Sequence, residues 1–300
     1  MTVLKWIGGI VGGLMLVAVI IVGVQILRFN RARAMVYDVP SPPIVASTDS
    51  AVIARGHHIA ASFGGCIGCH GEGLKGGDVD DIGPIGVIRA PNLTRGKGGV
   101  GDRYTDQQLA RTIRDGVRPD GRTLIWMPTE EHHWWPDEDL QAVVSYVRSV
   151  PPVDNEVAPA SVKTLGMVLT SFGVVKTLSH EMIDASAPRE AVPAPAPTAE
   201  YGAFLVRGCK GCHGEHLSGG RIPGAPASLP MPLNLTAHPS GLGGWTKEQF
   251  VTLLNTGVRP DGRKLDPFMP IATTRAMNDT EKSAIWAYLH SIEPRPEGER

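Results

Sequence analysis

Hydrophobic residues are concentrated in one long run at the start of the chain. Residues 6–24 contain no charge, and only Gln25 interrupts the apolar pattern before Leu27. At ~1.5 Å per residue, a helix of this length spans ~28–33 Å, enough to cross the ~30 Å hydrocarbon core of a bilayer. A cleaved signal peptide is the alternative, because Ala32-Arg33-Ala34 has the form of a cleavage site. The run is longer than a signal peptide needs and arginines crowd that site, so we expect a retained transmembrane anchor within residues 1–34.

After this run, apolar residues recur three or four positions apart, which places them on one face of a helix. Two such helices should begin near Asp137 and Asp279. Their apolar faces consist of Leu140, Val143, Val144 and Val147 in the first and of Ile285, Trp286, Leu289 and Ile292 in the second.

Other local signals also predict helices. Thr105-x-x-Gln108 and Thr246-x-x-Gln249 have the form of capping boxes, each opening a short helix. Two more helices are expected at about residues 51–62 and 200–207. No stretch shows the alternation that is typical of a strand, so the predicted fold class is all-α.

The two halves of the chain are copies of one unit. The seven residues from Gly116 to Arg122 recur letter for letter from Gly257 to Arg263. Asn-Leu-Thr at 92–94, Met-Pro at 127–128 and a tyrosine at 146 recur at offsets of 141 to 143 residues. The repeat predicts two domains of one fold, residues 45–152 and 198–300, joined by residues 153–197.

The connecting residues 153–197 carry two further patterns. Residues 190–199 contain Val-Pro-Ala-Pro-Ala-Pro, which is typical of a stiff extended spacer. Upstream, one helical face is shared by Leu165, Val168, Leu169 and Phe172. This segment is too short to span a membrane. We expect it to pack between the domains or against a partner.

The cysteines indicate the chemistry. All four lie in two C-x-x-C-H frames, residues 66–70 and 209–213. Two thiols a helical turn apart add across the vinyl groups of haem, and the adjacent histidine is then placed to ligate iron. A zinc half-site or a redox dithiol is the alternative, but no further cysteine remains to complete a zinc site. We expect two covalently bound haem c groups, held by Cys66, Cys69, Cys209 and Cys212 and ligated by His70 and His213.

The opposite axial ligand is expected to be methionine. Met127 lies 57 residues after His70, and Met269 lies 56 residues after His213. Each methionine follows an aromatic residue and precedes a proline at one repeat position. A thioether opposite imidazole favours reduced iron, which suits an electron carrier. The rival ligands are His57, His58, His132 and His133, none of which has a counterpart in the second unit.

The residues that hold the ligating histidines and the haem propionates can also be predicted. The other nitrogen of a ligating histidine is usually held by a backbone carbonyl. Proline-rich loops could supply this carbonyl through Pro84 or Pro91 in the first unit and Pro230 or Pro232 in the second. The repeated arginines could pair with haem propionates or with a partner, although solvated loop arginines are the simpler interpretation. These arginines are Arg118, Arg122, Arg259 and Arg263.

Charge affects the expected partners and topology. The net charge is −1, so nothing indicates nucleic acid as a partner. Only Lys5 precedes the apolar run, whereas three arginines follow it, Arg28, Arg31 and Arg33. By the positive-inside tendency, this distribution favours a cytoplasmic location for the rest of the chain. Haem attachment to C-x-x-C-H normally follows export, and long domains translocate largely regardless of charge. We therefore expect the haem domains on the periplasmic side of a bacterial inner membrane.

On these motifs, both units resemble class I cytochrome c domains. The order C-x-x-C-H, Asn-Leu-Thr, Thr-x-x-Gln, Gly-Val-Arg-Pro-Asp-Gly-Arg and Met-Pro is similar to that of multihaem cytochrome subunits of bacterial membrane-bound alcohol, aldehyde and sugar-acid dehydrogenases. The resemblance covers about residues 50–152 and 198–293. It implies mostly helical domains that each wrap one haem with His/Met ligation. Those subunits commonly carry three haem domains, whereas this chain has two and an N-terminal anchor.

The resulting functional hypothesis is single-electron transfer between redox proteins. The donor would be a dehydrogenase or a quinol-oxidising complex, and the acceptor a terminal oxidase or a soluble carrier. One alternative is a dihaem enzyme of the peroxidase or thiosulfate-oxidising type, in which one iron is open or differently ligated. Another is a structural or sensory subunit, in which the haem groups matter less.

Overall fold

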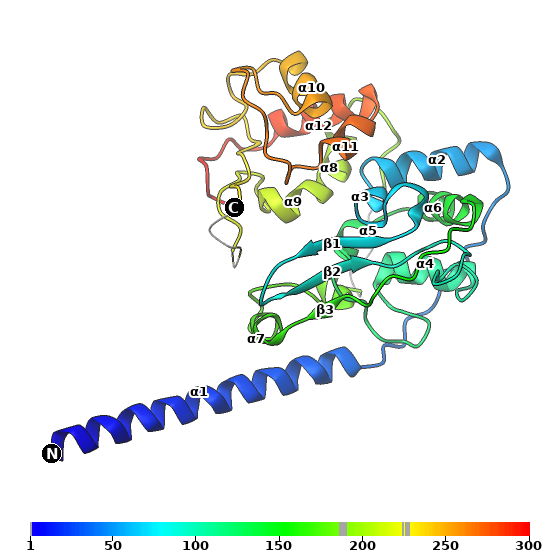
Figure 1. The fold of residues 1–300 in the computed structure, drawn as a ribbon. Helices are drawn as coiled ribbons and strands as arrows, with labels where there is room; N and C mark the ends of the chain where they lie inside the picture. The colour runs from blue at the N-terminus through cyan, green and yellow to red at the C-terminus, as the bar shows by residue number, and fades with distance from the viewer. Residues whose placement is uncertain (1, 186–190, 224, 226–228) are drawn as a thin grey trace.

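A computed structural model describes residues 2–185, 191–223, 225 and 229–300 (Figure 1). Residue 190 of the expected spacer lies outside these ranges. One long helix, α1 (Thr2–Ala34), precedes two mostly helical bodies that correspond to the two repeats. The first contains α2 (Ser50–Ala61), α3 (Cys66–His70), a 3-10 turn (Glu72–Leu74), β1 (Gly77–Asp81), β2 (Gly86–Ala90), α4 (Asp106–Asp115), α5 (Thr129–His132) and α6 (Asp137–Ser149). The connection contains β3 (Ser161–Val162), α7 (Thr164–Ser171) and a 3-10 turn (Ser179–Met182). The second contains α8 (Ala199–Leu205), α9 (Arg207–His213), α10 (Lys247–Thr256), α11 (Ile271–Ala276) and α12 (Asp279–Ser291).

The N-terminal helix extends beyond the predicted apolar run and projects away from both bodies (Figure 1). It is long and apolar enough to cross a membrane. Its side chains from Trp6 to Val24 are exposed along the whole run. Only near its end does α1 pack against the rest of the chain, where the side chains of Gln25 and Phe29 are buried against the connection.

The first and last helices of each repeat cross at a glycine. A Cβ added at Gly56 of α2 would overlap the backbone carbonyl of Ala142 in α6. The same overlap would occur between Gly202 of α8 and Ala284 of α12. Glycine is required at both positions because only a residue without a side chain lets the two backbones come this close. The first and last helices therefore cross in the same way in both repeats.

The predicted helix signals are confirmed. In both capping boxes the threonine accepts the N3 backbone N–H while the glutamine accepts the threonine N–H, so α4 and α10 begin as expected. α6 and α12 begin at Asp137 and Asp279. The whole predicted apolar face of α6 is buried, whereas in α12 Ile285 and Leu289 are buried and Trp286 and Ile292 are half-buried.

A small sheet departs from the expectation that no strand is present. β1 and β2 form an antiparallel hairpin, and β3 from the connection adds to β2 through Gly86 and Val162. β1 reads Gly-Asp-Val-Asp-Asp and is almost wholly exposed, so it buries no face that would impose alternation. The strands are set by hairpin pairing rather than by hydrophobic pattern. The fold remains mostly helical.

The repeated Asn-Leu-Thr motif fastens the chain that leaves each terminal helix. Asn92 Nδ2 donates to the carbonyl of Val153 at 2.7 Å, and Asn234 Nδ2 donates to that of Arg295 at 2.7 Å. In each case the backbone N–H of the motif's threonine donates to Oδ1 of the asparagine at 2.9 Å. The motif thus ties its own loop to the segment that follows the terminal helix of the same repeat, which explains why the motif recurs.

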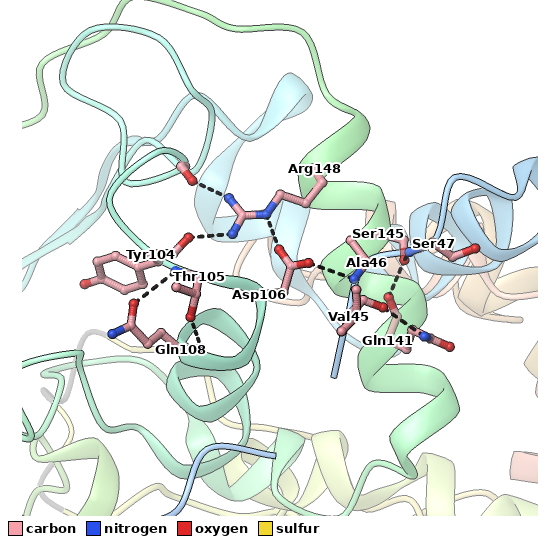
Figure 2. Close-up of polar contacts among 11 residues, drawn as sticks. Val45, Ala46, Ser47, Tyr104, Thr105, Asp106, Gln108, Gln141, Ser145 and Arg148 are labelled. Atoms are coloured by element: carbon pink, nitrogen blue, oxygen red, sulfur yellow. Dashed lines mark hydrogen bonds and ion pairs between the residues drawn. The ribbon is translucent and has the colours of Figure 1, made fainter. Parts of the chain in front are cut away.

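A polar network unique to the first repeat ties α4 and α6 to the segment before α2 (Figure 2). Asp106 accepts the backbone N–H of Ala46 at 2.8 Å and Arg148 Nε at 2.6 Å. Arg148 also donates to the carbonyls of Gly101 and Tyr104. Burial raises the pKa of Asp106, but these two donors outweigh it and hold the pKa below its usual value. The equivalent positions in the second repeat are Lys247 and His290, which cannot form this network.

Candidate haem sites

The two C-x-x-C-H frames form short helices. α3 covers the first frame and α9 ends with the second. Within each frame the cysteines are three residues apart, so they are neighbours on one helix surface. All four cysteines are free thiols in this structure. The spacing meets the requirement for attachment to two vinyl groups.

Each motif histidine is held through Nδ1 by a backbone carbonyl. His70 Nδ1 lies 2.9 Å from the oxygen of Pro91, and His213 Nδ1 lies 2.7 Å from that of Leu233. A carbonyl oxygen only accepts, so Nδ1 donates and the lone pair of Nε2 is available to iron. Burial lowers the pKa of both histidines, which favours the neutral form that ligates metal.

The carbonyl prediction is confirmed in the first repeat and wrong in the second. Pro91 is the partner as expected, but Leu233 takes the role proposed for Pro230 or Pro232. Both carbonyls directly precede the asparagine of the Asn-Leu-Thr motif. The position relative to this motif, rather than the proline, selects the carbonyl.

The environment of the cysteines does not suit reactive thiolates. Burial raises the pKa of Cys66 and of Cys209 to about 12, and nearby acidic or thiol groups add to the effect. Redox and zinc-binding cysteines instead lie beside positive charges or metal, which lower the pKa. Among the described residues, no group of three or more His, Cys, Asp or Glu side chains is placed to hold a metal ion. Burial of this kind is compatible with cysteines that serve as thioether anchors.

The candidate axial methionines lie at matching points before α5 and α11. The carbonyl of Met127 accepts the N–H of Thr129 at 2.9 Å, and that of Met269 accepts the N–H of Ile271 at 2.8 Å. Met127 packs against the same core as Cys66 and Ile67. Met269 lies instead in a pocket lined also by Leu265 and Pro270, and it is not among the described residues of that core.

The rival histidines all have structural contacts. His132 Nε2 lies 3.1 Å from the carbonyl of Gly64, and His133 Nδ1 lies 3.2 Å from that of Arg114. Burial lowers the pKa of His132 to about 4, which keeps its ring neutral. His57 packs edge-on against Tyr146, and His58 pairs with a glutamate of the second repeat.

Two arginine nitrogens fit the propionates of a bound haem. Within the described part of the chain, Nε of Arg118 and Nε of Arg259 are buried and have no hydrogen-bond partner. They occupy the same repeat position. Each side chain also lies beside a loop aspartate, with Arg118 Nη2 3.2 Å from Asp120 and Arg259 Nε 3.8 Å from Asp261. A buried nitrogen that lacks a hydrogen-bond partner costs free energy, so both positions suit a further acceptor such as a carboxylate. Arg122 and Arg263 are exposed and lie near Asp120 and Asp261, as expected for solvated loop arginines.

The two repeats meet through their C-x-x-C-H helices in a reciprocal manner. A Cβ at Gly68 of α3 would lie 3.9 Å from Thr273 Oγ1 in α11. A Cβ at Gly211 of α9, the equivalent glycine, would lie 3.6 Å from Glu131 Oε1 in α5. Positions 131 and 273 are also equivalent, each four residues after the candidate methionine. Each frame therefore abuts the segment that follows the methionine of the other repeat.

Sequence reasoning did not identify the role of Glu131. This side chain lies beside α9, and its charge acts on Cys69, Cys209 and Cys212 of both frames. Nothing in the local pattern distinguishes it from the neighbouring Glu130 or from a surface residue. Its placement depends on how the repeats dock, which no local signal encodes.

Comparison with known families settles what these units are. A family model described as cytochrome c oxidase, cbb3-type, subunit III matches residues 51–147, and a model described as cytochrome c matches residues 199–293. The chain contains two tandem cytochrome c family domains. Domains of this family carry covalent haem, so the two cytochrome c domains bind two haem c groups.

Curated relatives include cytochrome subunits of dehydrogenases. The fructose dehydrogenase cytochrome subunit of Gluconobacter japonicus is 27% identical over 91% of this chain and 58% of its own length. The cytochrome c subunit of an alcohol dehydrogenase (quinone) of Gluconobacter oxydans is 26% identical over 92% of this chain and 60% of its own length. The gluconate 2-dehydrogenase cytochrome c subunit of Pantoea cypripedii is 34% identical over 35% of this chain. The chain thus spans less than two thirds of the length of the curated relatives it matches.

Proposed function

We propose that this chain is a membrane-anchored dihaem cytochrome c that relays single electrons between redox proteins. Its cytochrome c domains would span residues 45–152 and 198–300. Cys66, Cys69, Cys209 and Cys212 would form the thioether bonds, and His70 and Met127 in the first domain and His213 and Met269 in the second would ligate iron. Bound haem supplies a centre that takes up and releases one electron.

The observation that carries the proposal is the reciprocal packing of the two C-x-x-C-H helices. Gly68 faces α11 and Gly211 faces α5, so both C-x-x-C-H frames lie at the domain interface. Phe63 and Phe204 also meet there, with ring centroids 6.0 Å apart. Attachment points on facing surfaces bring the two redox centres together, as a relay requires.

The protein residues supply positioning rather than chemistry. The carbonyls of Pro91 and Leu233 orient the histidines and raise the basicity of Nε2. Arg118 and Arg259 would neutralise propionate charge and fix the edge of each haem. A methionine on the opposite side would leave no axial position for a substrate.

The membrane anchor and the topology belong to the same proposal. α1 would cross the bacterial inner membrane, with the haem domains in the periplasm, where haem is attached to exported chains. The names of the relatives favour a dehydrogenase as electron donor. A quinol-oxidising complex is the second candidate donor, and a terminal oxidase or a soluble carrier is the proposed acceptor.

Carbon monoxide binding to the detergent-solubilised, reduced full chain tests the proposed relay. Two haem groups per chain and no carbon monoxide complex are the expected result. Binding at one haem would instead indicate the dihaem enzyme. A variant with Cys209→Ala and Cys212→Ala should retain one haem, and rapid photoreduction should then show no electron equilibration of the kind seen between two haems in the unaltered protein.

Reporter fusions test the topology. Alkaline phosphatase, which is active only after export, is fused after residue 300 and, as a control, in place of the chain after residue 5. Activity of the first fusion alone is expected. Activity of neither fusion would place the haem domains in the cytoplasm and would contradict the proposal.

A further inference from the structure

An exposed apolar surface lies on the connection between the two domains, beside the anchor helix. Leu165, Phe172 and Val174 are 44%, 54% and 43% exposed. These residues, called here the α7 patch, lie on α7 and on the turn that follows it. α7 contains no charged residue, and Figure 1 shows it alongside the C-terminal half of α1.

The α7 patch is held at a defined level of α1. Ser171 Oγ at the end of α7 donates to the backbone carbonyl of Gln25 at 2.9 Å. Gln25 and Phe29 are buried one helical turn apart on α1, and Phe29 joins a small core with Val162 and Leu178. Together, the Ser171–Gln25 hydrogen bond and the burial of Phe29 make the junction after α1 a packed interface rather than a flexible tether.

That level coincides with the end of the apolar run. The uncharged residues 6–24 are ~28 Å long at ~1.5 Å per residue, close to the thickness of the hydrocarbon core. Gln25 is the first polar side chain after the run, so it marks the membrane boundary. Phe172, adjacent to Ser171, lies beside that boundary.

We propose that the α7 patch inserts into the boundary between lipid headgroups and acyl chains, so that a lipid bilayer is its partner. The inference rests on the proposed membrane anchor. α1 contacts α7, and Val24 and Leu27 on α1 are exposed apolar side chains as well. Exposed Lys176 flanks the patch on one side, and such a cation suits anionic headgroups next to an apolar face. Lys163 flanks it on the other side, with Nζ 3.4 Å from Asp81. α1 and α7 would then fix the tilt of the first domain on the membrane.

Photo-crosslinking with a diazirine lipid tests this proposal on the unaltered full chain. Holoprotein is reconstituted into phosphatidylcholine vesicles with one fifth phosphatidylglycerol and a lipid that carries the diazirine near the start of its acyl chain. Trypsin cleavage after Lys163 and Lys176 releases residues 164–176, which contain the whole patch. Residues 265–275, with Phe268 at 43% exposure, provide a matched control peptide.

Lipid adducts on residues 164–176 and on α1, but not on residues 265–275, are expected. Leu165→Asp with Phe172→Asp should abolish the α7 adducts and leave those on α1, with an unchanged haem spectrum as evidence of folding. Adducts on α1 alone in the unaltered protein would overturn the proposal and leave the anchor intact. Adducts on neither segment, with the protein absent from floated vesicles, would refute the anchor itself.

Discussion

His58 Nε2 in the first domain lies 2.7 Å from Glu281 Oε1 in the second. The carboxylate of Glu281 is almost fully buried, and its other oxygen accepts the backbone N–H of Asn278 at 2.8 Å. That second bond belongs to the capping box that starts α12. One carboxylate therefore both begins the last helix and joins the two domains.

This pair predicts that the domain interface weakens in alkali. The hydrogen bond to Glu281 raises the pKa of His58, more than burial lowers it. A raised pKa means that the stabilisation is fully present below the ordinary value of about 6.5 and is lost as the pH rises through the folded value. His58→Gln should cost about 1 kcal/mol in free energy of unfolding at pH 6 and little at pH 9, as measured by urea denaturation.

His216→Gln is the matched control, because His216 is exposed. It should leave the unfolding free energy unchanged at both values of pH. An equal loss for His58→Gln at pH 6 and pH 9 would show that the imidazole acts through packing, and the charge argument would then fail.

The helix crossing in the first domain predicts a large effect from one methyl group. Gly56→Ala places a Cβ against the carbonyl of Ala142, so α2 and α6 must separate. We expect a loss of at least about 2 kcal/mol in free energy of unfolding, because overpacking against backbone has little room to relax. Gly244→Ala, where a Cβ meets no atom within 4 Å, should have little effect. Equal behaviour of the two variants would contradict the close crossing.

Local signals explain why much of this structure could be predicted. The capping boxes at Thr105 and Thr246 fix helix starts within four residues, and duplication doubles the evidence for each. The burial of Val143 and Val144 follows from helical spacing alone. The short helices over the frames, α3 and α9, were not among the predicted elements, although the spacing of the thiols agrees with the pitch of a helix.

Features that depend on docking could not be predicted. Strand β1 has no apolar face, and the two-residue β3, which pairs with β2, comes from the connection, so neither carries an alternating pattern. The carbonyl of Leu233 holds His213 through loop position rather than through residue type. Glu131 reaches both frames only because the two domains pack against one another. The roles of Met127 and Met269 in ligation stay predictions.

Those roles can be tested by an isosteric change. Met127→Leu and Met269→Leu should each open one axial position, so carbon monoxide should bind one haem of each reduced variant. The reduction potential of that haem should fall, because a thioether favours reduced iron. Met231→Leu is the control, since Met231 is 51% exposed and has no counterpart in the first repeat. A variant that excludes carbon monoxide and keeps both potentials would reassign the ligand at that position.

Glu131 predicts a second, separable effect of pH. Burial raises the pKa of Glu131 to about 8, and the charge of Glu130 adds to the effect. The folded chain then keeps this proton while the unfolded chain loses it near pH 4.5, so the free energy of unfolding should fall as the pH rises from about 4.5 to 8. The slope from one proton is at most about 1.4 kcal/mol per pH unit.

Glu131→Gln should flatten this fall, whereas Glu156→Gln, on an exposed side chain, should not. Potentiometry gives an independent readout. An ionised carboxylate beside both frames stabilises ferric iron, so both potentials of the unaltered protein should drop between pH 7 and pH 9. The drop should be smaller in Glu131→Gln, because this variant removes the charge beside the haem attachment points. His58→Gln should leave the drop unchanged, because His58 contributes to the contact between the two domains. Potentials independent of pH in the unaltered protein would show that Glu131 keeps one protonation state throughout.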